Sequence, residues 1–270
     1  PGTHSQPVAH RPAPRPVIRP VNVATASAPK HLKPGRPLPK SVVFGIPIFL
    51  ALLAVGFVAF QWWSQSVRNA RFAQLSQMDS PKGSADDVHL LLDYIEEKQT
   101  SDLAGKVLGK LQGADAGNHA IVARLSRLKT SWAKKNLATA AGQRNLKDAF
   151  DPLLKMLADT TEPDVRYAIW AALGRIATPS DSGSLVEKMH GLGLEELRAA
   201  EAALVTIARN EPDPTRRGLD VLQAYRANSL PDDEQAALLR ALCRIGNKEA
   251  LPDIVKALKS PNTKLRYNAT

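Results

Sequence analysis

Apolar and polar residues follow a helical period along the chain after residue 64. Apolar side chains recur at spacings of three and four, and no segment there shows the two-residue alternation of a half-buried strand. This pattern predicts helices over 85–98, 102–112 and 118–135, and a more regular series of helices from about residue 146 onward. We therefore expect an all-α fold.

Three of the predicted helices end in the same way. Their last residues share the form Ala-Leu-x-x-Ile at spacings of 31 and 38 residues, in the segments AALGRIA (171–177), AALVTIA (202–208) and RALCRIG (240–246). A shorter apolar-periodic segment precedes each of these helices, at 151–159, 183–192 and 218–228. A fourth unit begins at 250–260, and its LRYNA (265–269) aligns with VRYAI (165–169).

Helical pairs that repeat at this length predict an α-solenoid, since one pair cannot cover both of its apolar faces and neighbouring pairs must stack. Small residues such as Ala172 and Ala203 would let adjacent helices approach closely. Pro163, Pro231 and Pro261 fall where second helices are expected to begin, in the first turn that tolerates proline.

The stretch PDVRYAIWAALGRIA (163–177) resembles the second helix of the HEAT-like repeat family, as found in bacterial repeat proteins and phycobilin lyase subunits. The family pattern is Asp-x-x-Val-Arg-x-x-Ala-x-x-Ala-Leu-Gly-x-Ile. Asp164 lies one residue before Val165 instead of three, and Glu162 stands at the expected place. The resemblance covers 146–270 well and 85–140 weakly. It implies a fold and says little about function.

Residues 42–60 (VVFGIPIFLALLAVGFVAF) form an uncharged apolar run that differs from the rest of the chain. A helix of this length is about 28 Å long, which matches the hydrocarbon thickness of a bilayer. Lys40 precedes the run, and Trp62 and Trp63 follow it as aromatic anchors would at a membrane interface. We expect a single transmembrane helix over 41–63, with the lipid bilayer contacting 42–60.

Residues 1–40 hold ten of the twenty prolines, seven of the thirty-six Lys and Arg residues, and no Asp or Glu. Such a segment cannot bury enough apolar surface to offset its ordering entropy, so we expect a disordered tail. It is either a stiff linker or a ligand for a domain or an anionic surface. No aromatic residues interleave its bases, which argues against nucleic acid. The excess of positive charge predicts a cytoplasmic tail and an extracytoplasmic repeat domain, periplasmic if the organism is bacterial.

Two groups of residues could form a partner surface. Arg166, Arg198 and Arg266 recur near the starts of second helices. In HEAT-like repeats such arginines commonly pair with acids of neighbouring repeats, and the alternative is a row of anion-binding cations. Trp170, with Tyr167 one turn earlier, fills the core or forms an exposed anchor for a partner.

The chain shows no pattern typical of catalysis or metal binding. No P-loop, GxSxG, HExxH or Rossmann fingerprint occurs, and His89, His119 and His190 lack metal-ligand spacing. Cys243 lies in a helical apolar pattern, which predicts a buried thiol. We therefore expect no cofactor and no small-molecule substrate.

Four regions are predicted: the tail (1–40), the transmembrane helix (41–63), a helical juxtamembrane region that contains degenerate repeats or a separate bundle (64–140), and HEAT-like repeats (141–270). The favoured function is a membrane-anchored protein-binding scaffold without catalysis. The alternatives are a HEAT-like lyase or enzyme subunit, and part of a larger signalling protein. Because the last helix stops before its Ala-Leu-x-x-Ile end, we expect further residues after Thr270.

Overall fold

The computed structural model describes residues 40–227 and 230–269, with side chains from residue 51 onward. The predicted tail lies outside these residues, apart from the backbone of Lys40. The chain divides into two compact units, Pro1–Phe57 and Val58–Thr270. Throughout the described ranges the regular structure is helical, with one isolated bridge between Lys82 and Gln112.

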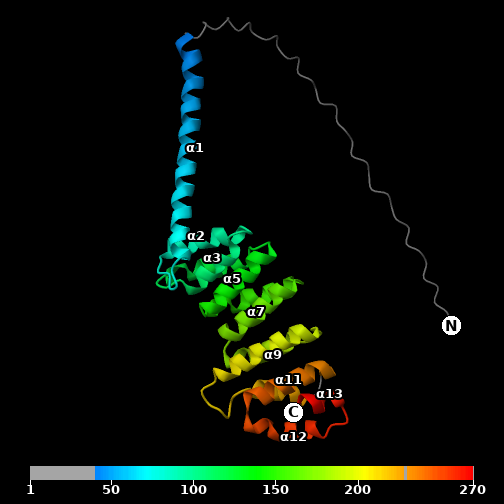
Figure 1. Ribbon diagram of the computed structural model, residues 1–270. Helices are drawn as coiled ribbons and strands as arrows, with labels where there is room; N and C mark the ends of the chain where they lie inside the picture. The colour runs from blue at the N-terminus through cyan, green and yellow to red at the C-terminus, as the bar shows by residue number, and fades with distance from the viewer. Residues whose placement is uncertain (1–39, 228–229, 270) are drawn as a thin grey trace, which may run out of the picture. The chain divides into compact units, whose positions relative to one another are not determined.

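Six helical pairs follow one another in the described part of the second unit. Figure 1 shows their second helices α3, α5, α7, α9 and α11 stacked in chain order. The first helices of the pairs are α2 (Ala85–Glu96), α4 (Asn118–Leu125), α6 (Phe150–Asp159), α8 (Ser182–Glu187), α10 (Leu219–Ala227) and α12 (Leu251–Leu258). The second helices are α3 (Ser101–Lys110), α5 (Ser131–Gln143), α7 (Pro163–Ile176), α9 (Leu194–Arg209), α11 (Asp232–Ile245) and α13 (Thr263–Asn268). Short 3₁₀ turns precede four of the first helices: η1 (Asp115–Gly117), η2 (Lys147–Ala149), η3 (Pro179–Asp181) and η4 (Lys248–Ala250).

Each second helix packs on the next one along the chain, from α3 through α13. This is the arrangement of an α-solenoid. The helical pairs also occupy 85–143, a region for which the sequence did not distinguish degenerate repeats from a separate helical bundle. The prediction of one helix over 118–135 was wrong, because α4 ends at Leu125 and α5 begins at Ser131. The break occurs without Gly or Pro, at Thr130, whose extended backbone begins the next helix.

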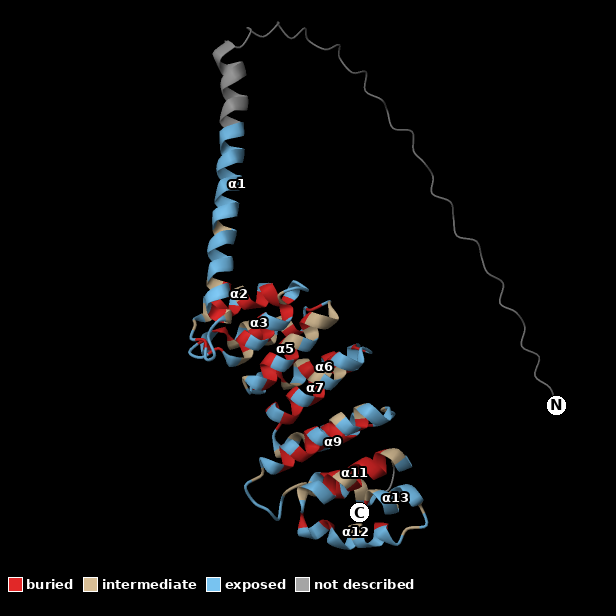
Figure 2. Cartoon of the chain, in the orientation of Figure 1, coloured by how far each residue is buried: buried red, intermediate tan, exposed pale blue. Residues whose placement is uncertain are grey.

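Close contacts between second helices depend on small residues. A Cβ atom built on Gly142 would lie 2.8 Å from the Cα of Ala172, and one on Gly174 would lie 2.9 Å from the Cα of Ala203. Both glycines occupy the same position in successive repeats, 32 residues apart. Figure 2 shows buried residues concentrated where α5, α7, α9 and α11 face their neighbours.

The prolines mark helix starts as expected. Pro163 is the first residue of α7, where the missing N–H has no intrahelical acceptor to lose. Pro231 directly precedes α11, and Pro261 lies two residues before α13.

The predicted membrane span falls within α1 (Lys40–Ser76). Among the residues whose side chains are described, no helix is both long and apolar enough to cross a membrane. Residues 42–50 of the span lie outside that set, so the span stays a prediction. The described part of α1 is pale blue almost throughout in Figure 2, and its large apolar side chains are more than half exposed: Leu52, Leu53, Val55, Phe57, Val58, Phe60, Trp62, Trp63 and Val67.

The last turns of α1 pack against α2 within the second unit. Phe72 and Leu75 are buried, and the ring of Phe72 stacks on Tyr94 with centroids 4.3 Å apart. Arg71 donates two hydrogen bonds to the Asp87 carboxylate, at 2.7 and 2.9 Å. Asp87 also accepts from the backbone N–H of Ser84 at 2.8 Å, so it forms part of a capping box at the start of α2.

These contacts predict an acid-sensitive joint. The Arg71 guanidinium, together with the Ser84 N–H, lowers the pKa of Asp87 from 3.8 to about 2. A lowered pKa stabilises the fold above the unfolded value near 4, and this contribution is lost as the pH falls from about 4 towards 2. Asp87→Asn should cost about 2 kcal/mol at neutral pH and weaken this pH dependence, as measured by urea unfolding between pH 2 and 7.

The matched control is Asp93→Asn, because the ion pair of Asp93 with Arg68 is half exposed on both sides. It should cost less than about 1 kcal/mol. Equal losses in the two variants would contradict the assignment of Asp87 to this joint.

The close contact between Gly174 on α7 and Ala203 on α9 leads to a second prediction. Gly174→Ala should lower the free energy of unfolding by about 1 to 3 kcal/mol, because the added methyl group would press on the backbone at Ala203. Gly183→Ala is the control, since Gly183 lies in α8 with no atom within 4 Å of the place that its new methyl group would take. It should be neutral or stabilising by up to about 1 kcal/mol, owing to helix propensity. Thermal and urea unfolding of the two variants measures the difference.

Candidate functional site

Arg166 joins three helices instead of facing solvent. From the start of α7 its Nε donates to both carboxylate oxygens of Glu196 on α9, each at 2.8 Å. Its Nη1 donates to the carbonyls of Leu157 and Thr160 at 2.6 and 2.8 Å. Carbonyls at a helix end lack intrahelical donors, so Arg166 supplies them for α6. This is the structural pairing that the resemblance implied.

Trp170 lies one turn after Arg166 and is fully buried. Its indole N–H donates to the same carboxylate, at 2.8 Å from Glu196 Oε1. Of the two interpretations of Trp170, core filling is confirmed and the exposed anchor is wrong, because Trp170 shares with Arg166 a helix face that packs on α9. Sequence reasoning missed Glu196, whose only signal was an acid at the start of the following second helix.

The other two candidates are exposed. Arg198 pairs with Glu195 on its own helix, at 3.2 Å and with both side chains 69 % exposed. It therefore does not repeat the interhelical contact of Arg166. Tyr167 is 37 % exposed, although it lies only one turn before the buried Trp170.

Tyr167 lines two hollows between α7 and α9, which we call together the Tyr167 groove. The wider hollow, of about 680 Å³, lies where the two helices begin, and its other lining residues are Thr161, Pro163, Arg166 and residues 191–196. The narrower hollow, of about 250 Å³, continues along the helices and is also lined by Ala171, Gly174, Arg175, Ala199, Ala202, Ala203 and Thr206. Two of the four predicted surface residues, Arg166 and Tyr167, thus line the groove, and Tyr167 lines both of its hollows.

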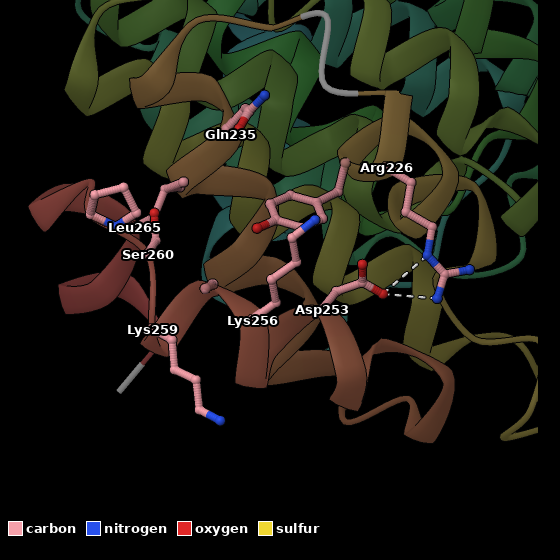
Figure 3. Close-up of a pocket in the computed structure, with 10 residues that line it drawn as sticks. Arg226, Gln235, Asp253, Lys256, Lys259, Ser260 and Leu265 are labelled. Atoms are coloured by element: carbon pink, nitrogen blue, oxygen red, sulfur yellow. Dashed lines mark hydrogen bonds and ion pairs between the residues drawn. The ribbon is translucent and has the colours of Figure 1, made fainter.

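A further pocket of about 610 Å³ lies among α10, α11, α12 and α13 (Figure 3). Arg226 spans one edge of it, donating to Asp253 from two nitrogens at 3.0 and 2.8 Å. Lys256 and Lys259 add positive charge. Burial, with the nearby Asp253 carboxylate, raises the pKa of the Tyr225 phenol at the pocket wall. Nothing in the sequence pattern pointed to this pocket.

Cys243 is exposed, so the prediction of a buried thiol was wrong. It occupies the position of Gly174 in its own repeat, on the side of α11 that faces the next second helix. The six-residue helix α13 leaves a hollow of about 430 Å³ there, which Cys243 lines with Arg240, Arg244, Tyr267 and Asn268. The helical period placed Cys243 correctly on this face and gave no measure of how far the neighbour covers it.

Within the described ranges, no group of three His, Cys, Asp or Glu side chains is arranged to hold a metal ion. His89 and His119 are exposed, and His190 lies 3.3 Å from the buried carboxylate of Glu234.

The predicted interface anchors of α1 are only partly described. Trp62 and Trp63 are 76 % and 61 % exposed, and the ring of Trp63 lies 6.4 Å from that of Phe60. The side chain of Lys40 lies outside the described residues.

The comparison with known families agrees with the helical pairs. Residues 119–223 match the family described as HEAT repeats, from α4 through most of α10. No curated protein matches the chain. The match supports a HEAT-like repeat protein, and repeats of this kind generally present surfaces to other proteins.

The Glu196 cluster leads to a test with adjacent residues. Glu196→Gln should destabilise the fold by about 2 to 4 kcal/mol, because it leaves the largely buried Arg166 charge without a carboxylate and disturbs the Trp170 contact. Glu195→Gln should cost less than about 0.5 kcal/mol, since it removes only an exposed pair. Thermal and urea unfolding of the two variants measures the difference, and comparable losses would contradict the structural role of Glu196.

Proposed function

We propose that this protein is a membrane-anchored scaffold that binds another protein through the exposed face of its second helices and performs no catalysis of its own. The observation that carries the proposal is the composition of that face. Along α5, α7 and α9 its exposed positions hold Lys135, Tyr167, Arg175, Arg198 and Thr206, while the buried positions complete the stack.

The face suits recognition because it combines hollows with mixed chemistry. Tyr167 offers an aromatic ring with a polar tip, of the kind enriched at interfaces. Arg175 and Arg198 supply positive charge. The small side chains of Ala171 and Ala202 leave a depression between α7 and α9. Glu196 and Arg166, which line the larger hollow, are engaged with each other in an ion pair at 2.6 Å.

The membrane anchor is the part of the proposal that rests on residues 42–60. Their uncharged run is long enough to span a bilayer, and it continues without a helix break into the exposed Trp62 and Trp63. A free apolar helix surface of this extent is costly in water. The charge bias then favours a cytoplasmic tail and a repeat domain on the other side.

One experiment tests both parts in intact cells. A photo-cross-linking amino acid is placed in the full chain at Ala202, on the second-helix face, or at Ser184, an exposed position of the first helix α8. Membranes are then isolated and washed with alkaline carbonate. We expect the chain to stay in the washed membrane and a discrete adduct to form from Ala202 only.

The two parts fail separately. A chain released by carbonate would overturn the membrane anchor and leave the scaffold standing. Adducts at Ser184 alone, or at neither position, would overturn the assignment of the binding face.

A further inference from the structure

The Tyr167 groove has two walls and a narrow floor. Tyr167, Ala171 and Arg175 lie four residues apart along α7 and form one wall, while Ala199, Ala202 and Thr206 on α9 form the other. Side chains spaced by four residues lie above one another on a helix, so the groove runs along the two helices. At its floor Gly174 and Ala203 bring the helices together.

The packing of α7 on α9 explains why the residues at the floor of the groove are small, but it does not explain the small alanines in its walls. Gly174 and Ala203 are buried, and a larger residue at Gly174 would push the helices apart. Ala171 and Ala202 are exposed, so stacking does not limit their size. Their methyl groups keep open a channel that longer side chains would fill.

The wide end of the groove is apolar and holds a large exposed side chain. Leu194 is 62 % exposed where α9 begins, beside Leu192 and Pro163. Two of the three charges that line this end, Arg166 and Glu196, form an ion pair at 2.6 Å, and the third, Glu195, pairs with Arg198 on its own helix. An incoming apolar side chain would remove Leu194 and one face of Tyr167 from water.

The narrow end carries an uncompensated cation. Arg175 is exposed in the last turn of α7 and makes no hydrogen bond or ion pair with any residue that the structure describes. None of the residues lining the narrow hollow is acidic. The helix dipole accounts for a base at this end, and it does not account for a guanidinium beside an open channel. A guanidinium in that position suits a carboxylate.

We propose that the Tyr167 groove binds a short extended segment of a partner protein, with a bulky apolar side chain at the Leu194 end and a carboxylate side chain at Arg175. From Tyr167 to Arg175 is eight helical residues, about 12 Å. An extended chain covers that distance in about four residues. The segment therefore carries an Asp or Glu four residues from its apolar anchor. This inference rests on the proposed scaffold function and names the ligand of its binding face.

The rim of the groove argues against a polyanion as the occupant. Glu195 lines the wide end and is exposed, and its carboxylate would repel a phosphate backbone. One cation at one end matches a single carboxylate better than a row of phosphates.

The test selects ligands from a phage-displayed library of random eight-residue peptides on the full chain in detergent. On the wild-type protein we expect enriched peptides in which an apolar residue and an Asp or Glu lie four positions apart, in one order throughout. On Arg175→Glu the acidic position should become Lys or Arg. An enriched peptide should lose affinity about tenfold or more when its acid is changed to the amide, as expected for a charge-assisted hydrogen bond.

Two further variants complete the design. Arg209→Glu is the matched control, because Arg209 is an exposed base in the last turn of α9 outside the groove lining, and it should select the wild-type pattern. Ala202→Trp should abolish binding by filling the channel at an exposed position that the fold does not depend on. Circular dichroism and the unfolding midpoint establish that each variant is folded.

No enrichment on the wild type, the same acidic pattern on Arg175→Glu, or full binding by Ala202→Trp would each overturn the proposal. If cross-linked adducts form at Ala202 in cells but the phage selection yields no such peptides, the scaffold function is retained and only the proposed acidic peptide ligand is rejected.

Discussion

The close approach of consecutive second helices is the constraint on which the rest of the structure depends. Each helical pair has apolar faces on both sides, so it is stable only when neighbours cover them. Gly142 against Ala172 and Gly174 against Ala203 allow backbone contacts that any larger residue would prevent. The register of one repeat on the next is therefore set at a few small residues, and the aliphatic core on either side follows from it.

Buried ion pairs between second helices also fix the register of one repeat on the next. Glu196 ties α9 to α7 through Arg166, and Glu201 ties α9 to α11 through Arg240 at 2.8 Å. A buried carboxylate without its arginine would be costly, so these pairs disfavour slipped arrangements more than they add net stability. The contact of Arg71 with Asp87 plays the same part where α1 meets the first repeat.

The side chains that helix stacking leaves exposed are the ones that can bind a partner. On α7 the exposed Tyr167, Ala171 and Arg175 form a free strip, and the rest of the helix between them is mostly buried. The exposed alanines of α7 and α9 form no part of the core, and they are the reason that a groove exists between two helices in contact. The proposed binding face and the proposed membrane anchor lie in separate parts of the chain, so each can change without disturbing the other.

The sequence by itself determined the helical pairs, their repeat length and their proline-marked starts, because periodicity and chain breakers act locally. It could not locate the break before Ser131, where no Gly or Pro interrupts the pattern. It did not decide whether Trp170 lies in the core or on the surface, and it wrongly predicted a buried Cys243. The reason in both cases is that burial depends on how much of a helix face the neighbouring helix covers. Glu196 and the Tyr167 groove were decided by the tertiary structure alone, because both are formed by residues about 30 positions apart that meet only when the repeats stack.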